Sequence, residues 1–321
     1  MRPSRWRIER GVLALAPALL GGCFDFDATM AGGPPGDSGS EAGPDATDAG
    51  GSPAEPGDAI ADAQGGGPSD ADADGAVDAG RAFCASLARP DGGLFFCDDF
   101  DEHALPGSWQ YYGETAGTLL ETDAAARSAP RSAEETTMPL TSGEPIDVAL
   151  RTPLPVPALP ATLTFAFSLE PLQIAPTAGA AIVLGAVDFL DSAGYRYTVG
   201  LAINVASGQP ALALGEQSGL ADGGSFPDGA PPTFVNHPLP PTLTLPTNAW
   251  TDLAIEIDWT TTTLEGKVRV NGATQLDVPL DMSVQPTSIQ IGIGTSYVTE
   301  YATGTSPVWA LRYDNVVFTG Q

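Results

Sequence analysis

Residues 250–280 read WTDLAIEIDWTTTTLEGKVRVNGATQLDVPL, and this stretch decides the fold class. Apolar and acidic residues alternate through its first part; the apolar set is Leu253, Ile255, Ile257 and Trp259, and the acidic set is Asp252, Glu256 and Asp258. Alternation with a period of two is typical of a β-strand with one buried face. Asn271 and Gly272 follow a second alternating run, and this pair is preferred in two-residue hairpin turns because both residues tolerate positive φ. The stretch therefore predicts a strand followed by a hairpin.

Similar strand patterns lie on both sides of this stretch. They cover residues 162–169, 195–205, 210–216, 288–294 and 308–320. Residues 180–190 are almost uniformly apolar, which indicates a strand buried on both faces. Residues 217–247 are rich in glycine and proline and predict a long loop or an excursion at a sheet edge. Since no helical period is present from residue 83 to residue 321, we predict one all-β domain there.

The chain begins with a targeting segment. Residues 1–22 read MRPSRWRIERGVLALAPALLGG, in which four arginines precede a short uncharged apolar run. This run is too short for a transmembrane helix, which needs about 20 residues, and it has the length of a signal-peptide core. Leu20-Gly21-Gly22-Cys23 resembles the processing site of bacterial lipoproteins. The resemblance implies cleavage before Cys23 and a lipid anchor on its thiol, and Phe24 in place of aspartate favours the outer membrane of a Gram-negative bacterium.

Residues 23–82 are predicted to be the lipidated N-terminus and a tether. Asp, Gly, Ala and Pro dominate this segment, which has no aromatic residue after Phe26 and no hydrophobic period. Such a composition cannot bury enough apolar surface to offset the conformational entropy of the chain. We therefore expect a disordered acidic linker that holds the domain of residues 83–321 away from the lipid surface.

The charge of the chain excludes one class of partner. The sequence has 13 basic and 40 acidic residues, for a net charge of −27. Because nucleic-acid binding requires a positive surface facing the phosphates, nucleic acid is not an expected partner.

Residues 94–320 resemble the concanavalin A-like lectin and glucanase superfamily, including laminin-G-like domains. The shared pattern consists of DDFD…LPGSW at 98–109, the strand that begins at Trp250, the Asn271-Gly272 hairpin, IGIG at 291–294 and DNV at 314–316. The resemblance implies a jelly-roll β-sandwich of about 12–14 antiparallel strands. These segments mostly reflect requirements of the fold, so they indicate architecture better than activity.

Cys84 and Cys97 are the only cysteines besides Cys23. In an exported protein, two cysteines this close in sequence most simply form a disulfide, although two free thiols are the alternative. A disulfide would fix the N-terminal arm where the tether enters the domain.

Glu256 and Asp258 are the candidate catalytic residues. The glucanases of the superfamily that this chain resembles carry E-x-D-x-x-E on one strand, whereas Thr261 occupies the position of the second glutamate here. Glycoside hydrolysis usually needs two carboxylates, so this departure removes one of the pair. The alternative is that both acids belong to the solvent face of a half-buried strand.

A different catalytic set occurs in alginate-lyase-like relatives of the same superfamily, which use His, Tyr, Arg and Gln. Residues of these types are present here, but no motif joins them. The only histidines, His103 and His237, are far apart and lack the spacing of a zinc site.

Three aspartates are candidate ligands of a structural calcium ion. Asp99 and Asp101 lie in the first expected strand segment, and Asp314 lies in the last. In jelly-roll carbohydrate modules the first and last strands lie side by side and often share a calcium ion held by oxygen ligands. The alternative is that these are solvated acids at strand ends. No other cofactor is expected.

Sugar-binding surfaces present exposed aromatic side chains beside polar groups. The main candidates are Trp109, Tyr297 and Tyr301, followed by Tyr111, Tyr112 and Trp309. For each of them, packing in the core is the alternative.

Three functional hypotheses follow. The first is a non-catalytic surface lipoprotein whose sandwich binds a carbohydrate or another extracellular partner. The second is a divergent polysaccharide hydrolase or lyase of the same superfamily. The third is a structural envelope protein without a small ligand. The missing glutamate at Thr261 favours the first hypothesis.

Overall fold

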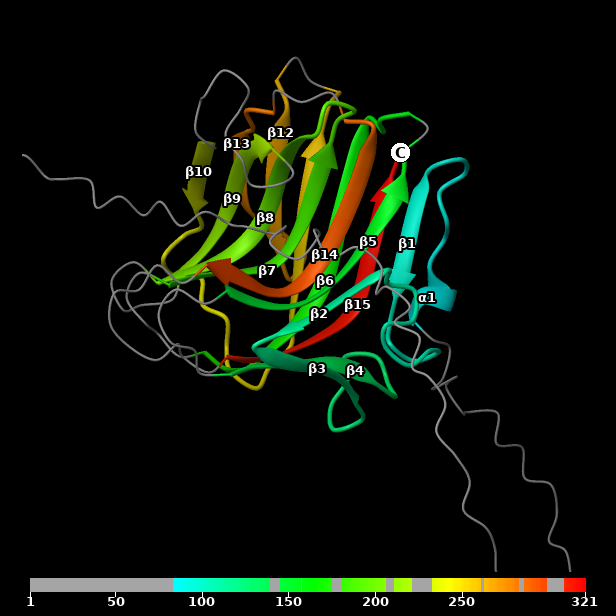
Figure 1. Ribbon diagram of the computed structural model, residues 1–321, viewed down its shortest axis with the longest axis vertical. Coiled ribbons are helices and arrows are strands. Elements are labelled where there is room, and N and C mark those ends of the chain that lie inside the picture. Colours follow the sequence, from blue (N-terminus) through cyan, green and yellow to red (C-terminus); the bar gives the residue numbers. More distant parts are fainter. Residues whose placement is uncertain are drawn as a thin grey trace, which may run out of the picture.

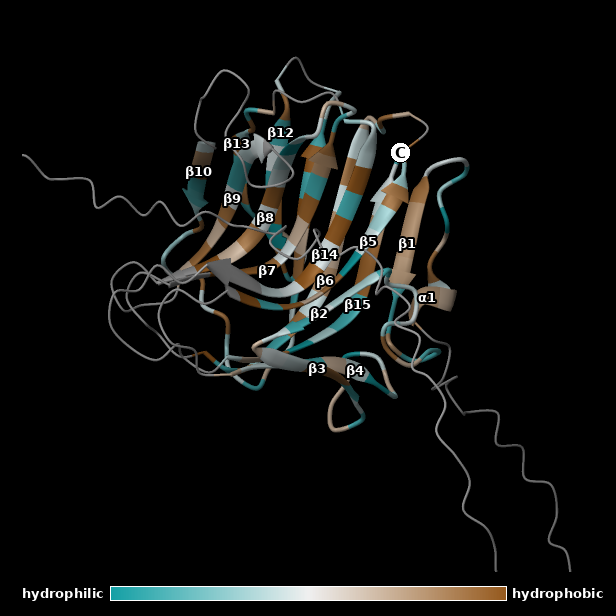
Figure 2. Ribbon diagram, in the orientation of Figure 1, coloured by the Kyte–Doolittle hydropathy of each residue, from teal (hydrophilic) through white to brown (hydrophobic). Residues whose placement is uncertain are grey.

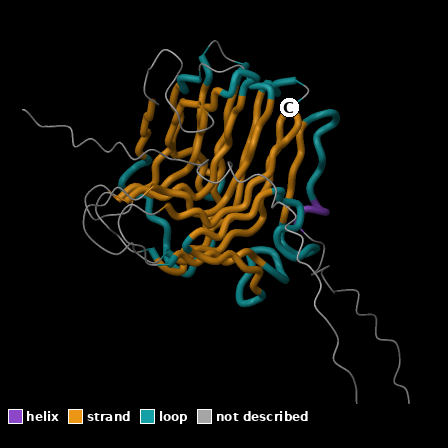
Figure 3. The backbone as a smooth tube through the Cα atoms, in the orientation of Figure 1, coloured by secondary structure: helices purple, strands orange, loops and turns teal. Residues whose placement is uncertain are grey.

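The computed structural model describes residues 83–138, 145–156, 158–174, 180–205, 211–220, 233–260, 263–282, 286–298 and 309–321. The segments 1–22 and 23–82, with Cys23, lie outside these residues. The described part contains one short helix, α1 (Phe83–Ser86), and is otherwise built from strands and loops, as Figure 3 shows. None of its helices is long and apolar enough to cross a membrane.

Eight strands form the first sheet, sheet A. They are β1 (Leu94–Asp98), β3 (Gly117–Thr122), β4 (Ser132–Thr137), β6 (Thr162–Gln173), β11 (Thr251–Asp258), β12 (Glu265–Val270), β13 (Ala273–Pro279) and β15 (Ala310–Gly320). Their order is β13-β12-β11-β6-β15-β4-β3, and β1 also pairs with β15. The first and last strands are therefore neighbours, as Figure 1 shows.

Seven strands form the second sheet, sheet B. They are β2 (Tyr111–Thr115), β5 (Pro145–Pro155), β7 (Ala180–Leu190), β8 (Tyr195–Val205), β9 (Ala211–Leu220), β10 (Thr233–Pro238) and β14 (Ser288–Val298). Their order is β10-β9-β8-β7-β14-β5-β2. Every pairing in both sheets is antiparallel.

The hydrophobic core lies between the two sheets. Its buried residues alternate along the strands; β11, for example, contributes Leu253, Ile255 and Ile257, and β14 contributes Ile289 and Ile291. Figure 2 shows the same alternation as brown and pale bands along the strands. Because period-two burial on both sheets fills one shared core, the architecture is a β-sandwich.

The predicted all-β fold is confirmed, with 15 strands in the described residues in place of about 12–14. β7 and β8 have the predicted bounds, and β7 is buried on both faces as expected. The hairpin turn at Asn271 and Gly272 has φ values of 49° and 78°, which is the positive-φ geometry predicted for this pair.

The structure adds strands that the sequence patterns did not indicate. The stretch 217–247 contains the end of β9 and the whole edge strand β10, so it is in part an edge excursion; residues 221–232 lie outside the described part. β3 and β4 also went unpredicted, because glutamates interrupt their apolar pattern. One of these, Glu135, faces the core with 0% exposure, contrary to the usual rule for acids.

The predicted disulfide is confirmed. Cys84 in α1 is bonded to Cys97 in β1, with 5.7 Å between their Cα atoms. The backbone N–H of Cys84 also donates a hydrogen bond to Asp99 at 2.9 Å. Both contacts fix the start of the domain to β1.

Candidate functional site

The side of sheet B that faces away from the core, its outer face, carries an unusual row of polar residues. Gln290 in β14 pairs with Asp188 in β7, Asp188 with Thr198 in β8, and Thr198 with Gln217 in β9. Gln290, Asp188 and Thr198 are only 3–7% exposed. The Thr198 hydroxyl donates a hydrogen bond to Asp188. Nearly buried polar side chains outside the core need partners, so this polar row is a candidate binding surface.

Small residues form a parallel row beside the polar row. The residues that face each other across β14, β7, β8 and β9 are Gly292, Ala186, Gly200 and Gly215. A small pocket opens over one end of this row, and its lining includes Thr198, Gln217 and Phe234. The Oε1 atom of Gln217 is buried there without a hydrogen-bond partner in the described part of the chain.

Arg151 and Asp147 form a buried ion pair at the other end of the small row. Both belong to β5 on the outer face, and their side chains are only 7% and 10% exposed. Nη1 of Arg151 lies 3.0 Å from Oδ2 of Asp147, and its Nη2 contacts the other carboxylate oxygen. The stem of Arg151 passes over Gly292, where a Cβ would lie 3.2 Å from its Cγ. A side chain at position 292 would therefore crowd the aliphatic stem of Arg151.

Tyr111 borders this ion pair. It lies in the edge strand β2, pairs in register with Arg151, and is 41% exposed. Side chains of directly opposed residues are about 5 Å apart at Cβ. Gln290 lies diagonally across from Arg151, since Arg151 pairs with Gly292 two residues along β14. The outer face of sheet B therefore brings a tyrosine, an arginine and a glutamine together.

The candidate acids Glu256 and Asp258 lie elsewhere, on the outer face of sheet A. The Glu256 carboxylate is 2.7 Å from Nε of Arg269 on the neighbouring strand. Asp258 accepts a 2.7 Å hydrogen bond from the backbone N–H of Thr260, and hydrogen bonding by the Thr260 hydroxyl and amide lowers the pKa of Asp258. Both contacts are ordinary for surface acids, so they favour the solvent-face interpretation of these two residues.

The aspartates proposed as calcium ligands are bonded to the backbone. Asp101 accepts the N–H of Arg131 at 2.9 Å, and Asp314 accepts the N–H groups of Arg127 and Ser128 at 2.7 and 2.9 Å. Burial raises the pKa of Asp314 to about 7. Among the described residues, no group of three His, Cys, Asp or Glu side chains is arranged to hold a metal ion. The calcium site stays a prediction.

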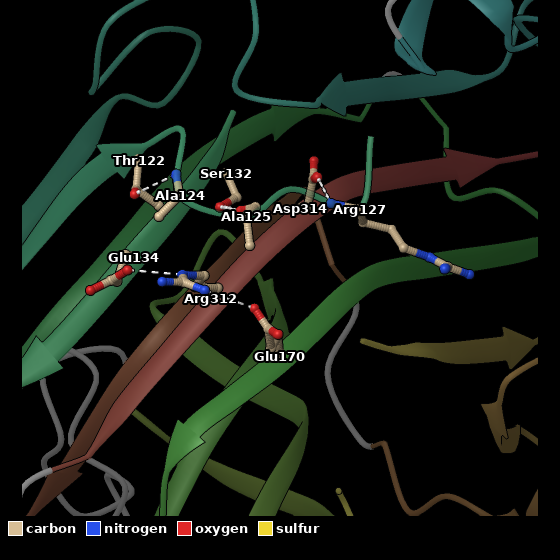
Figure 4. A network of polar contacts seen from close by, with 9 residues as sticks. All are labelled: Thr122, Ala124, Ala125, Arg127, Ser132, Glu134, Glu170, Arg312 and Asp314. Atoms are coloured by element: carbon tan, nitrogen blue, oxygen red, sulfur yellow. Dashed lines mark hydrogen bonds and ion pairs between the residues drawn. The ribbon is translucent and has the colours of Figure 1, made fainter. Parts of the chain in front are cut away.

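Figure 4 shows how these contacts organise the outer face of sheet A. Arg312 lies between Glu134 and Glu170, at 2.8 and 3.0 Å, and both pairs raise the pKa of Arg312 against the effect of its burial. The amide of Arg127 points to Asp314 in the same view. Each charge in this network already has a protein partner, so the network holds strands and a loop together.

The aromatic candidates have different outcomes. Trp109 is only 3% exposed and packs edge-on against Phe96, so its prediction as a sugar platform is wrong: it is a core residue. The core alternative also holds for Trp309, which is 1% exposed. Tyr297 pairs in register with Ile146, but its side chain lies outside the described part of the structure, as does all of Tyr301. Both stay predictions.

The two histidines do not reach the polar row. His103 is exposed on a loop beside Glu102. His237 contacts Glu216, which also accepts a hydrogen bond from the hydroxyl of Tyr197. Burial, together with the hydrogen bond to Glu216, raises the pKa of the Tyr197 hydroxyl well above its usual value. Because Leu212 and Leu214, two and four residues before Glu216, face the core, this trio belongs to the inner side of sheet B.

Comparison with known proteins identifies the fold without identifying a family. No protein-family pattern matches the chain, and no curated protein matches its sequence. Among solved structures, it is similar to an endo-β-1,4-glucuronan lyase from the fungus Trichoderma reesei, with 16% identity, a TM-score of 0.54, and coverage of 70% of this chain and 95% of that one. An alginate lyase from a Chlorella virus (13% identity, TM-score 0.46) and a β-glucanase from Bacillus licheniformis (11%, 0.39) cover 67% and 71% of this chain and 94% and 98% of their own.

The similarity to the glucuronan lyase structure shows that the chain has a jelly-roll β-sandwich fold, as its sequence resemblance implied. At 16% identity, this similarity shows the fold alone.

Sequence reasoning missed Arg151 and all the residues of the polar row. One signal was available: Asp188 is the only charged residue in the apolar strand 180–190, and a charge in a strand buried on both faces requires a specific partner. No local signal links Tyr111, Arg151 and Gln290, because they belong to three strands that are far apart in sequence.

Proposed function

We propose that this protein binds an acidic polysaccharide on the outer face of sheet B and cleaves it by β-elimination. The observation that carries the proposal is the juxtaposition of Tyr111, Arg151 and Gln290 on one face. Arginine and glutamine are suited to neutralise a sugar carboxylate, since guanidinium binds carboxylates in a bidentate manner and an amide donates to them. Three of the four residue types that alginate-lyase-like relatives use (His, Tyr, Arg and Gln) thus meet at one place, although no sequence motif joins them.

The chemistry assigns one role to each residue. Arg151 and Gln290 hold the uronate carboxylate and stabilise the negative charge that develops when the adjacent C–H bond breaks. Tyr111 acts as its phenolate: its oxygen accepts this proton, the C–H electrons form a carbon–carbon double bond, and the glycosidic C–O bond breaks. The departing oxygen then takes the proton back from Tyr111. The polar row from Asp188 to Gln217 binds neighbouring sugar units through their hydroxyl groups.

The similarity to a glucuronan lyase supports the choice of substrate class, since the name of that protein specifies a uronate polymer. At 16% identity this is support from the fold alone. The residues above carry the assignment for this chain.

Replacing Tyr111 by phenylalanine is expected to reduce the cleavage of glucuronan or alginate by at least about 100-fold, the usual contribution of a general acid–base group. The ultraviolet absorbance of the unsaturated product measures cleavage, and isothermal titration calorimetry measures binding. Binding should survive within a few-fold, because the aromatic ring remains. Tyr112→Phe is the matched control, since its hydroxyl donates to Glu114 and Leu119 away from Arg151. Cleavage that persists in Tyr111→Phe would remove Tyr111 from the chemistry.

A second candidate function is binding without cleavage. It is favoured by the Asp147–Arg151 pair, because Asp147 already neutralises the guanidinium that the elimination would use. In that case the wild-type protein binds glucuronan or alginate and releases no unsaturated product. The same two measurements on the wild-type protein therefore distinguish the two functions.

The location of the protein is a separate part of the proposal. We propose that Cys23 carries a lipid and that residues 24–82 tether the sandwich to the outer membrane, as the signal segment implies. Metabolic labelling with a palmitate analogue in a bacterial host is expected to mark the wild-type chain and to be lost in Cys23→Ser. Labelling that survives this substitution would contradict the anchor.

A further inference from the structure

Glu135 is the most deeply buried acid near the candidate site. It lies in β4 of sheet A, faces the core, and has 0% exposure. Its Oε2 atom accepts a 3.0 Å hydrogen bond from the backbone N–H of Thr295, which belongs to β14 of sheet B. This bond crosses from one sheet to the other. It is therefore a polar connection through an otherwise apolar core.

The hydrogen bond from Thr295 to Glu135 lies at a β-bulge in β14. β14 pairs regularly with β7 up to Ile293 and resumes at Ser296, so Gly294 and Thr295 lack partners on β7. Gly294 has a φ of 109°, and a Cβ there would lie 2.3 Å from the carbonyl oxygen of Val148. A β-bulge frees backbone groups from the ladder and re-aims the strand. Glu135 provides the acceptor that the freed N–H of Thr295 requires.

Burial and a few neighbouring groups together set the pKa of the Glu135 carboxyl. Burial is the main cause that raises this pKa to about 8, and the charge of Asp147 on β5 acts in the same direction. The Thr295 amide and hydroxyl on β14 and the Tyr313 hydroxyl on β15 lower it. Tyr313 is fully buried itself, and the carboxyl of Glu135 helps to raise its pKa well above the usual value.

The same strand carries the residues of the candidate site. Gln290 lies in β14 on one side of the bulge, and β5, which pairs with β14 along its whole length, carries Arg151 and Asp147. Arg151 pairs with Gly292, which lies two residues before the bulge and two residues after Gln290, so the bulge directly adjoins the candidate site along β14.

We infer that Glu135 is a positioning residue, whose neutral carboxyl group holds the bulge of β14 against sheet A and so sets the geometry of Arg151 and Gln290. It touches no substrate. The inference rests on the proposed function only where it concerns cleavage. When Glu135 ionises, a negative charge appears inside the core behind Asp147, and the bulge and the Arg151 pair shift together.

The sign of the pH dependence follows from the folded-state pKa, which is higher than the usual 4.5 of glutamate. The stability that the neutral carboxyl contributes is complete below pH 4.5 and is lost progressively as the pH rises to about 8. Glu135→Gln keeps an acceptor and a donor without the charge. We therefore expect the equilibrium constant for folding of the wild-type protein to fall, relative to that of Glu135→Gln, by about three orders of magnitude between pH 4.5 and pH 8.5.

The test uses the full chain, its Glu135→Gln variant and a Tyr313→Phe variant. In the wild-type protein, the amide resonance of Thr295 and the Nε resonance of Arg151 are expected to titrate together with a midpoint near pH 8. Glu135→Gln should abolish both titrations and preserve glucuronan cleavage above pH 8, where the wild type loses it. Tyr313→Phe should move the midpoint upward, because it removes the hydroxyl that lowers the pKa of Glu135.

The outcomes separate this inference from the proposed function. If Glu135→Gln leaves either titration in place, or if the Arg151 resonance does not follow that of Thr295, the positioning role is overturned. Both resonances are read without any polysaccharide. Absence of glucuronan cleavage at every pH would therefore count against the proposed function, while the two titrations would still decide the role of Glu135.

Discussion

Arg151→Ala is expected to abolish cleavage of glucuronan and to lower the free energy of unfolding by about 3–5 kcal/mol. The guanidinium is paired with Asp147 through both terminal nitrogens, and both side chains are at most 10% exposed. Truncation removes the group proposed to bind the uronate carboxylate and also removes the guanidinium that pairs with the buried Asp147. An uncompensated buried charge is what makes the loss of one partner so costly. Urea denaturation and product absorbance measure the two effects.

A double substitution separates stability from function at this pair. Asp147→Leu together with Arg151→Met removes both charges and keeps comparable volume, so stability is expected to return to within about 1–2 kcal/mol of the wild type. Cleavage should stay absent, because the carboxylate-binding group is gone. Recovery of cleavage in the double variant would show that Arg151 has no part in substrate binding.

Asp314→Ala is expected to destabilise the chain by at least about 3 kcal/mol, since three part-buried N–H groups lose their acceptor at about 1–3 kcal/mol each. Asp314 accepts hydrogen bonds from the N–H groups of Arg127, Ser128 and Asn315, the last at 2.7 Å. It joins the loop before β4 to the last strand, with 0% exposure. Urea denaturation measures the loss, and hydrogen exchange should show faster exchange at Arg127 and Ser128.

Asp277→Ala is the matched control for this substitution. Asp277 is an exposed strand acid whose carboxylate lies 3.9 Å from Lys267, and its loss should cost less than about 0.5 kcal/mol. If the two variants are equally stable, the hydrogen bonds to Asp314 do not hold the loop.

Local patterns in the sequence were sufficient for many strands. The alternation from Leu253 to Trp259 and the turn at Asn271-Gly272 predicted β11 to β13, because period-two burial and positive-φ turn residues are set by neighbours in the chain. The same reasoning failed for β4. From the sequence, Glu135 is expected on the surface, because acids are rarely buried. In the structure it is buried, and it accepts the backbone N–H of Thr295 in the bulge of β14, 160 residues away.

The candidate site shows the same division more sharply. Glu256 and Asp258 stood out in the sequence because they match part of a local motif, and in the structure they are paired or capped on the outer face of sheet A. Tyr111, Arg151 and Gln290 carry no local motif. They meet because sheet B places β2, β5 and β14 side by side.

By itself, the sequence determined the all-β class, the disulfide between Cys84 and Cys97, and the position of most strands. All of these follow from periodicity, turn chemistry and cysteine spacing, which act over short distances along the chain. Only the tertiary structure decided which polar residues share a face and which acid lies in the core. Strand order arises from packing two whole sheets around one apolar interior, and that packing brings together residues that no short stretch of sequence connects.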